Sequence, residues 1–206
     1  CQNGMDVYVE KPFGRTIEEG RAMLEAARKH ERIVQMGTQW RSAQHYADAV
    51  AYVQSGKLGT LRAVRAWSYK DFDVRPQEDS APPEGVDYDL WLGPSPERPF
   101  NPNRFHRNFR WYWDYAGGLM TDLGVHSLNL CQWATGLEMP TRISAMGGMR
   151  LMGDTGIETP DTQTTIYDFP TYTLTWEHQL RGTLGPQASS EGAWFSGVNG
   201  AVWASG

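Results

Sequence analysis

Residues 6–37 read DVYVEKPFGRTIEEGRAMLEAARKHERIVQMG, and this stretch decides the class of the fold. Residues 6–10 form a short apolar run of β-forming side chains that a proline and a glycine soon end. Thr16 and Glu19 make a capping box, after which apolar residues recur at helical spacing. A second short apolar run, 33–36, closes at a glycine. The pattern predicts a βαβ crossover, whose parallel strands need further strands beside them.

The rest of the chain predicts a mixed α/β (α+β) fold with a mostly antiparallel open sheet. Residues 70–108 carry most of the prolines without periodicity, which predicts a long loop of the kind that often binds ligands. The turns between the late strands favour antiparallel pairing with helices on one face. The helices are expected at 42–54 and 121–135, and the strands at 61–69, 142–151, 162–169, 172–180 and 193–203.

Composition narrows the possible partners. The 206 residues include 19 Lys plus Arg against 24 Asp plus Glu, a net charge of −5, which argues against nucleic acid and against a polybasic membrane contact. No apolar stretch approaches the roughly 20 residues that span a bilayer. Only Cys1 and Cys131 are present, so a disulfide framework is not expected, and Cys131 is predicted to lie in the core.

The first residue, Cys1, indicates that something upstream was removed or is not included. A truncated chain is favoured over a processed lipoprotein, because a strand follows within a few residues instead of a flexible tether. Localisation stays unknown on this basis, with the cytoplasm favoured and export possible.

Glu10, Lys11 and Pro12 stand at the carboxyl end of the first predicted strand. Ligands of open α/β sheets bind outside such strand ends, so the Lys11 ammonium could orient a hydroxyl or carry a proton if burial lowered its pKa. The alternative is a structural salt bridge between Glu10 and Lys11.

Asp122 and His126 are four residues apart on a predicted helix, so both side chains share one face. Asn129 and Trp133 continue that face, while Leu123 is expected on the opposite face toward the core. A carboxylate beside an imidazole raises its basicity and orients it, as a general acid or base near pH 7 requires. A surface ion pair is the alternative. A metal site is not predicted, because no further ligands stand at a telling spacing.

Aromatic and basic side chains gather at Trp40-Arg41 and at 108–115. Aromatic faces with Arg donors suit polyhydroxylated ligands, because sugar C–H faces stack while hydroxyls accept and donate hydrogen bonds. The alternative is that many of these tryptophans are core residues.

Together, VYVEKP at 7–12, VQMGTQWR at 34–41 and GGLMTDLGVH at 117–126 resemble the Gfo/Idh/MocA family of NAD(P)-dependent sugar and cyclitol oxidoreductases. The resemblance implies that 1–37 is the C-terminal remnant of a nucleotide-binding Rossmann domain. It implies that 38–206 is a substrate-binding and dimerisation α+β domain, incomplete at its C-terminus, whose open sheet forms a homo-oligomer contact. Ala116 departs from a glycine that is common in the family, and Asn129 from an aspartate.

The resemblance also implies roles for single residues. His126 would be the acid/base that takes the hydroxyl proton, with Lys11 and Asp122 beside it as catalytic residues. The residues implied in cofactor binding are Glu10, Lys11, Pro12 and Gln39, and those implied in substrate binding are Arg41, Trp111 and Asn129.

The Gly-x-Gly-x-x-Gly phosphate-binding turn is absent from this sequence, so the chain alone is expected to bind NAD or NADP poorly and to be inactive. The leading hypothesis is a partial NAD(P)-dependent oxidoreductase acting on a secondary hydroxyl of a sugar or cyclitol. Two alternatives stay open: an NAD-dependent glycoside hydrolase that oxidises transiently, and a non-catalytic sugar-binding or dimerisation module.

Overall fold

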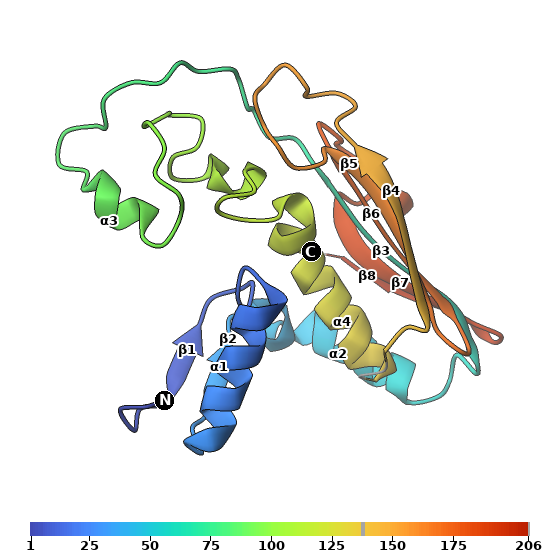
Figure 1. Ribbon diagram of the computed structural model, residues 1–206. Coiled ribbons are helices and arrows are strands. Elements are labelled where there is room, and N and C mark those ends of the chain that lie inside the picture. The colour runs from blue at the N-terminus through green and yellow to red at the C-terminus, as the bar shows by residue number, and fades with distance from the viewer. Residues whose placement is uncertain (137–138, 206) are drawn as a thin grey trace.

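The structure, a computed structural model, describes residues 1–136 and 139–205 and contains two sheets (Figure 1). A small unit at the N-terminus holds two strands and a helix. A six-stranded sheet with helices against one of its faces makes up the larger part of the molecule. No helix in the described ranges is both long and apolar enough to cross a membrane.

The N-terminal unit is the predicted βαβ crossover. Strands β1 (Val7–Val9) and β2 (Val34–Met36) pair in parallel, and α1 (Ile17–Lys29) connects them. The capping box is confirmed: the Glu19 backbone N–H donates to Thr16 Oγ1 over 3.2 Å, and the Glu19 carboxylate accepts from the Thr16 N–H over 3.3 Å. This unit leaves large apolar side chains exposed, namely Met5, Tyr8, Ile17, Leu24 and Ile33.

The larger sheet has the strand order β4-β5-β6-β3-β7-β8. Strands β3 and β6 are parallel and the other neighbouring pairs are antiparallel, which confirms a mostly antiparallel sheet. The bounds are β3 Leu61–Lys70, β4 Arg142–Gly148, β5 Thr162–Asp168, β6 Thr173–Leu180, β7 Glu191–Gly197 and β8 Gly200–Ala204.

Two predicted strands differ from the structure for local reasons. The run at 193–203 is a hairpin of two strands, because Asn199-Gly200 is a turn signal that interrupts the apolar alternation. The strand predicted at 142–151 stops at Gly148. Beyond it, the carboxylate of Asp161 accepts the backbone N–H groups of residues 150–152 at 2.7–3.0 Å and draws them into a turn.

Helices α2 (Gln44–Gln54) and α4 (Val125–Thr135) pack on one face of the sheet, as predicted (Figure 1). Their buried side chains meet fully buried sheet residues such as Trp176 and Phe195. Cys131 is 0 % exposed, so its predicted core position is confirmed. This packing fixes the axis of α4, on which His126 is carried.

The segment between β3 and α4 includes the long loop predicted at 70–108. It contains the short helix α3 (Tyr88–Leu92) and a 3₁₀ turn, η2 (Asn108–Trp111). A further 3₁₀ turn, η1 (Gln39–Ser42), follows β2, and another, η4 (Pro186–Ala188), precedes β7. The helix expected at 121–135 begins as a π-helical turn, η3 (Met120–Gly124), and becomes α-helical only at Val125. π-Helical turns of this kind occur frequently at functional sites.

Candidate active site

Lys11, just beyond β1, joins the N-terminal unit to the π-helical turn. Its Nζ donates to Asp122 Oδ1 over 2.6 Å and to the Asp122 backbone oxygen over 2.7 Å. Both side chains are largely buried, with 19 % and 11 % of their surfaces exposed. An ammonium group has three protons, and these two bonds use two of them. The third proton is free to meet a ligand oxygen.

The other oxygen of Asp122 faces a second cation. Arg110 Nη1 lies 3.1 Å from Asp122 Oδ2, and the guanidinium lies within 6.0 Å of the ring centroids of Phe109 and Trp111. Charge-assisted contacts of this kind are the stronger ones in proteins. Asp122 therefore holds Lys11 and Arg110, whereas the sequence led us to expect that it orients His126.

His126 lies on the first turn of α4 and is 2 % exposed. Its ring stacks on Trp40, with centroids 5.4 Å apart and an interplanar angle of 23°. Burial lowers the pKa of His126, and the positive charge of Lys11 lowers it further, while Asp122 and Glu191 oppose both effects. The expectation of raised basicity is therefore wrong, because desolvation and Lys11 outweigh the carboxylates. The neutral imidazole that results near pH 7 can accept a proton.

Lys11, Asp122 and His126 line one open pocket of about 450 Å³. Sequence reasoning brought these three together correctly and missed several other lining residues. Among the missed residues, Lys70 Nζ and Glu191 Oε2 lie 3.0 Å apart. The remaining residues that line the pocket are Gln39, Trp40, Asp71, Phe72, Arg107, Arg110 and Leu123.

Leu123, expected on the core side of the helix, packs against the second core cluster and also lines this pocket. Its additional place in the pocket was not predicted, because residues 120–124 form a π-helical turn, which does not keep the α-helical spacing assumed from the sequence. A glycine-rich lead-in to a helix was the only signal in the sequence for this irregularity.

The other predicted site residues lie outside this pocket, except for Gln39. Glu10 and Pro12 are exposed beside it. Arg41 Nε donates to Asn129 Oδ1 over 2.8 Å, and its guanidinium lies 5.0 Å from the Trp133 ring, which confirms that Asn129 and Trp133 share one helix face. Glu10, Pro12, Arg41 and Asn129 therefore do not line the pocket.

Trp111, implied in substrate binding, is 0 % exposed and belongs to a second core cluster with Leu119 and Met152. Its ring meets Phe72 edge-on at 4.9 Å. Trp111 thus supports Phe72 and Arg110, which do line the pocket, and offers no surface of its own to a ligand.

The pocket fits the nicotinamide end of a dinucleotide. Gln39 offers an amide to a carboxamide group, while the free proton of Lys11 faces the same pocket. Next to them Gly37 is buried, and a Cβ there would come within 3.1 Å of the Glu10 carboxylate and the Tyr8 hydroxyl, so the backbone leaves little room for a side chain. Nδ1 of His126 is enclosed without a hydrogen-bond partner in the described part of the chain.

Comparison with known proteins finds similarity to oxidoreductases. The family model described as "Oxidoreductase family, C-terminal alpha/beta domain" matches residues 52–147. The chain is 24 % identical over 147 residues to scyllo-inositol 2-dehydrogenase (NAD(+)) of Bacillus subtilis, covering 71 % of this chain and 33 % of that protein. It is 27 % identical over 187 residues to trans-1,2-dihydrobenzene-1,2-diol dehydrogenase of Bos taurus, covering 88 % of this chain and 44 % of that protein.

Among solved structures, a levoglucosan dehydrogenase in complex with NADH and levoglucosan matches with a TM-score of 0.72 and 18 % identity. The match covers 99 % of this chain and 48 % of that one, so the two share a fold. The chain therefore spans less than half the length of each of these relatives.

Proposed function

We propose that this chain is part of a Gfo/Idh/MocA oxidoreductase, and that the protein carrying it oxidises a secondary hydroxyl of a sugar or cyclitol by hydride transfer to NAD or NADP. The observation that carries the proposal is the meeting of Lys11, Asp122 and His126 in one polar pocket. Residues 1–37 would contribute to the cofactor side of the site, and 38–206 to its substrate side.

Each side chain has a distinct task in this scheme. The nicotinamide, when bound, accepts the hydride from the substrate carbon. The third proton of the Lys11 ammonium hydrogen-bonds the reacting hydroxyl oxygen and stabilises negative charge that develops on it. His126, neutral because burial and Lys11 lower its pKa, takes the hydroxyl proton. Asp122 fixes Lys11 without taking part in the proton transfer.

The substrate class is proposed from the relatives and from the pocket together. The names of the three relatives describe dehydrogenases of an inositol, of a dihydrobenzene diol and of levoglucosan. The pocket combines charged donors and acceptors with the rings of Trp40 and Phe72, a set that suits a ring carrying several hydroxyls.

The test is to incubate the protein with NAD or NADP and with inositols, levoglucosan and simple hexoses in turn, and to follow NAD(P)H formation by absorbance. We expect His126→Asn to lower turnover of the best substrate by about 10²–10⁴-fold. His45→Asn is the matched control, because His45 is exposed and does not line the pocket, and it should leave turnover unchanged.

The outcomes separate the alternatives. Cleavage of a glycoside without net NADH release would favour the glycoside hydrolase. Sugar binding that survives in His126→Asn, in a protein with no turnover under any condition, would favour a binding module. Equal activity in His126→Asn and wild type would remove His126 from the mechanism.

We also propose that the open face of the large sheet is the contact of a homo-oligomer. One transverse row across this face runs Ser144, Ile166, Thr175, Arg65, Trp194 and Trp203, and the helices cover the opposite face. Met146 on this sheet is 80 % exposed. A charged residue there, Met146→Glu, should lower the molar mass measured by light scattering, and an unchanged mass would contradict the proposal.

A further inference from the structure

A second pocket, of about 340 Å³, lies in the long loop away from the acid/base residues. It is lined by Trp91, Ser95, His106, Phe109 and Tyr115, and we call it the aromatic pocket. Four of its five lining residues carry rings, and each keeps some exposed surface. None of these five residues lines the catalytic pocket, so the aromatic pocket has no part in the scheme above.

The two pockets share a wall. His106 and Phe109 line the aromatic pocket, whereas Arg107 and Arg110, the next residue in each case, line the catalytic pocket. Neighbouring Cα atoms are about 3.8 Å apart, so both spaces lie against this single short segment. Arg110 in that segment contacts Asp122, which ties the shared wall to the catalytic residues.

The rings of the aromatic pocket are held by their neighbours. Trp91 meets Tyr115 edge-on at 5.2 Å and lies 5.4 Å from Phe105. Behind the same ring, Tyr88 stacks on Trp91 at 5.6 Å. His106 adopts a φ of +50°, a conformation that side chains other than glycine seldom take, which indicates that the surrounding loop constrains it.

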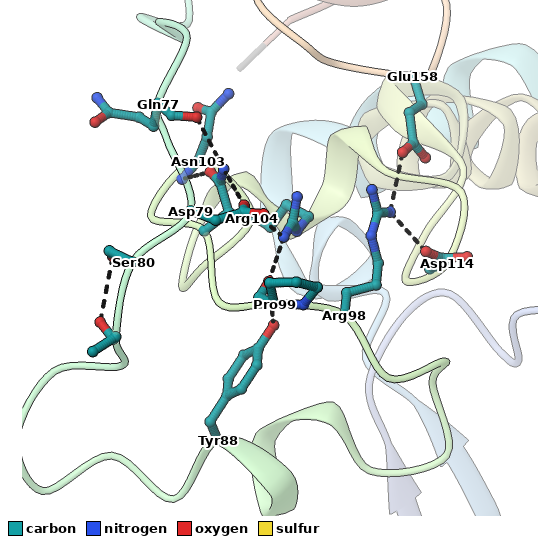
Figure 2. Close-up of polar contacts among 12 residues, drawn as sticks. Gln77, Asp79, Ser80, Tyr88, Arg98, Pro99, Asn103, Arg104, Asp114 and Glu158 are labelled. Atoms are coloured by element: carbon teal, nitrogen blue, oxygen red, sulfur yellow. Dashed lines mark hydrogen bonds and ion pairs between the residues drawn. The ribbon is translucent and has the colours of Figure 1, made fainter.

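Polar contacts brace the loop that carries these rings (Figure 2). Arg98 Nη1 lies between the Asp114 carboxylate at 2.7 Å and the Glu158 carboxylate at 3.1 Å. Arg104 donates to the backbone oxygen of Pro99, which also accepts from the Tyr88 hydroxyl over 3.4 Å. The loop therefore presents the aromatic pocket as a preformed site, in which binding loses little ordering entropy.

We propose that the aromatic pocket binds a second sugar ring of the substrate, the ring that is not oxidised. The proposal deepens the proposed function and rests on it. Ring faces attract sugar C–H groups, and Ser95 adds a hydroxyl that can donate and accept. The Tyr115 hydroxyl is enclosed, so Tyr115 contributes its ring to the pocket and the polar contact comes from Ser95. The preferred substrates are then glycosides of a cyclic polyol rather than the free polyol.

The experiment compares a free hexose with its methyl glycoside and with the matching disaccharide. Wild-type protein should show a lower KM for the disaccharide than for the other two. Trp91→Ala should raise the KM for the disaccharide about 3–10-fold, the value of an aromatic contact, and leave the KM for the hexose unchanged. Tyr52→Ala, at an exposed ring on α2 outside both pockets, is the matched control.

A second variant guards against a folding defect in Trp91→Ala. Ser95→Phe fills the aromatic pocket and removes no ring, so it should abolish the preference for the disaccharide while the thermal midpoint stays within a few degrees of wild type. Titration of Trp fluorescence with the disaccharide in the absence of NAD tests the pocket independently of turnover. Quenching should occur in wild type and not in Ser95→Phe.

Three outcomes would overturn the inference. Equal KM values for hexose and disaccharide in wild type would show that no second ring is recognised. A parallel loss for both substrates in Trp91→Ala would show a general structural effect. Quenching by the disaccharide that persists unchanged in Ser95→Phe would place the sugar outside the aromatic pocket. If instead no substrate is oxidised but the disaccharide still quenches Trp fluorescence, the proposed function is wrong while sugar binding in the aromatic pocket is supported.

Discussion

The most direct perturbation of the candidate site is Asp122→Asn, which removes the charge that both Lys11 and Arg110 contact. Each charge-assisted hydrogen bond contributes about 1.5–3 kcal/mol when partly buried. The two contacts, at 2.6 and 3.1 Å, together bring about 3–6 kcal/mol. The amide oxygen of Asn keeps a neutral bond to Lys11, so we expect a net loss of about 2–4 kcal/mol in the free energy of unfolding.

Urea denaturation measures this loss. With a slope of about 2 kcal/mol per molar urea, the midpoint should fall by about 1–2 M. Asp168→Asn is the control, because its ion pair with Arg142 spans 3.7 Å between exposed side chains and should contribute no more than about 0.5 kcal/mol. If Asp122→Asn lowers the free energy of unfolding by no more than the control does, then the contacts of Asp122 with Lys11 and Arg110 do not stabilise the fold as proposed.

Three further predictions concern single residues. An NMR titration should show the His126 imidazole protonating below pH about 6.5, because burial and Lys11 lower its pKa, and Lys11→Met should move the midpoint to higher pH. Gly118→Ala should cost at least about 1–2 kcal/mol in a thermal melt, because φ there is +68° and the new Cβ would lie 2.7 Å from Thr159. Cys131, 0 % exposed with a thiol pKa that burial raises to about 12, should resist iodoacetamide in the folded protein and react in urea.

Each of these has a result that contradicts it. A His126 midpoint above 6.5 would mean that Asp122 and Glu191 dominate its environment. Gly56→Ala, where φ is +75° and nothing lies within 4 Å of the new Cβ, isolates the backbone strain, so an equal loss there would show that the contact with Thr159 contributes nothing. Rapid labelling of the folded chain at Cys131 would show that the α4 packing opens readily.

Local patterns in the sequence predicted much of the fold. The capping box at Thr16 and Glu19 depends on residues three apart, and the structure forms it as expected. Buried and exposed positions on α4 follow from a period of 3.6, which placed Cys131 correctly. Such features are predictable because the interactions that decide them lie within one turn of the chain.

The missed features depend on distant pairing. Lys70 and Glu191 meet because β3 and β7 pair in the register that sets Ser68 opposite Glu191, and no local pattern encodes that alignment. Arg110 belonged to a recognised aromatic and basic stretch, yet its contact with Asp122 depends on how the long loop folds back onto the π-helical turn. The site residues supplied by short motifs were therefore foreseeable, while those supplied by sheet register and loop path were not.

The π-helical turn at Met120–Gly124 has a consequence for how this site can vary. In an unbroken α-helix each residue advances the azimuth by about 100°, so the directions of two side chains are locked to their separation in sequence. The π-helical turn changes the angle between the side chains of Asp122 and His126 from the value that an α-helix would impose. Asp122 can be aimed at Lys11 while His126 stays stacked on Trp40, and a one-residue insertion or deletion in the lead-in would re-aim the carboxylate without disturbing the packed helix below it.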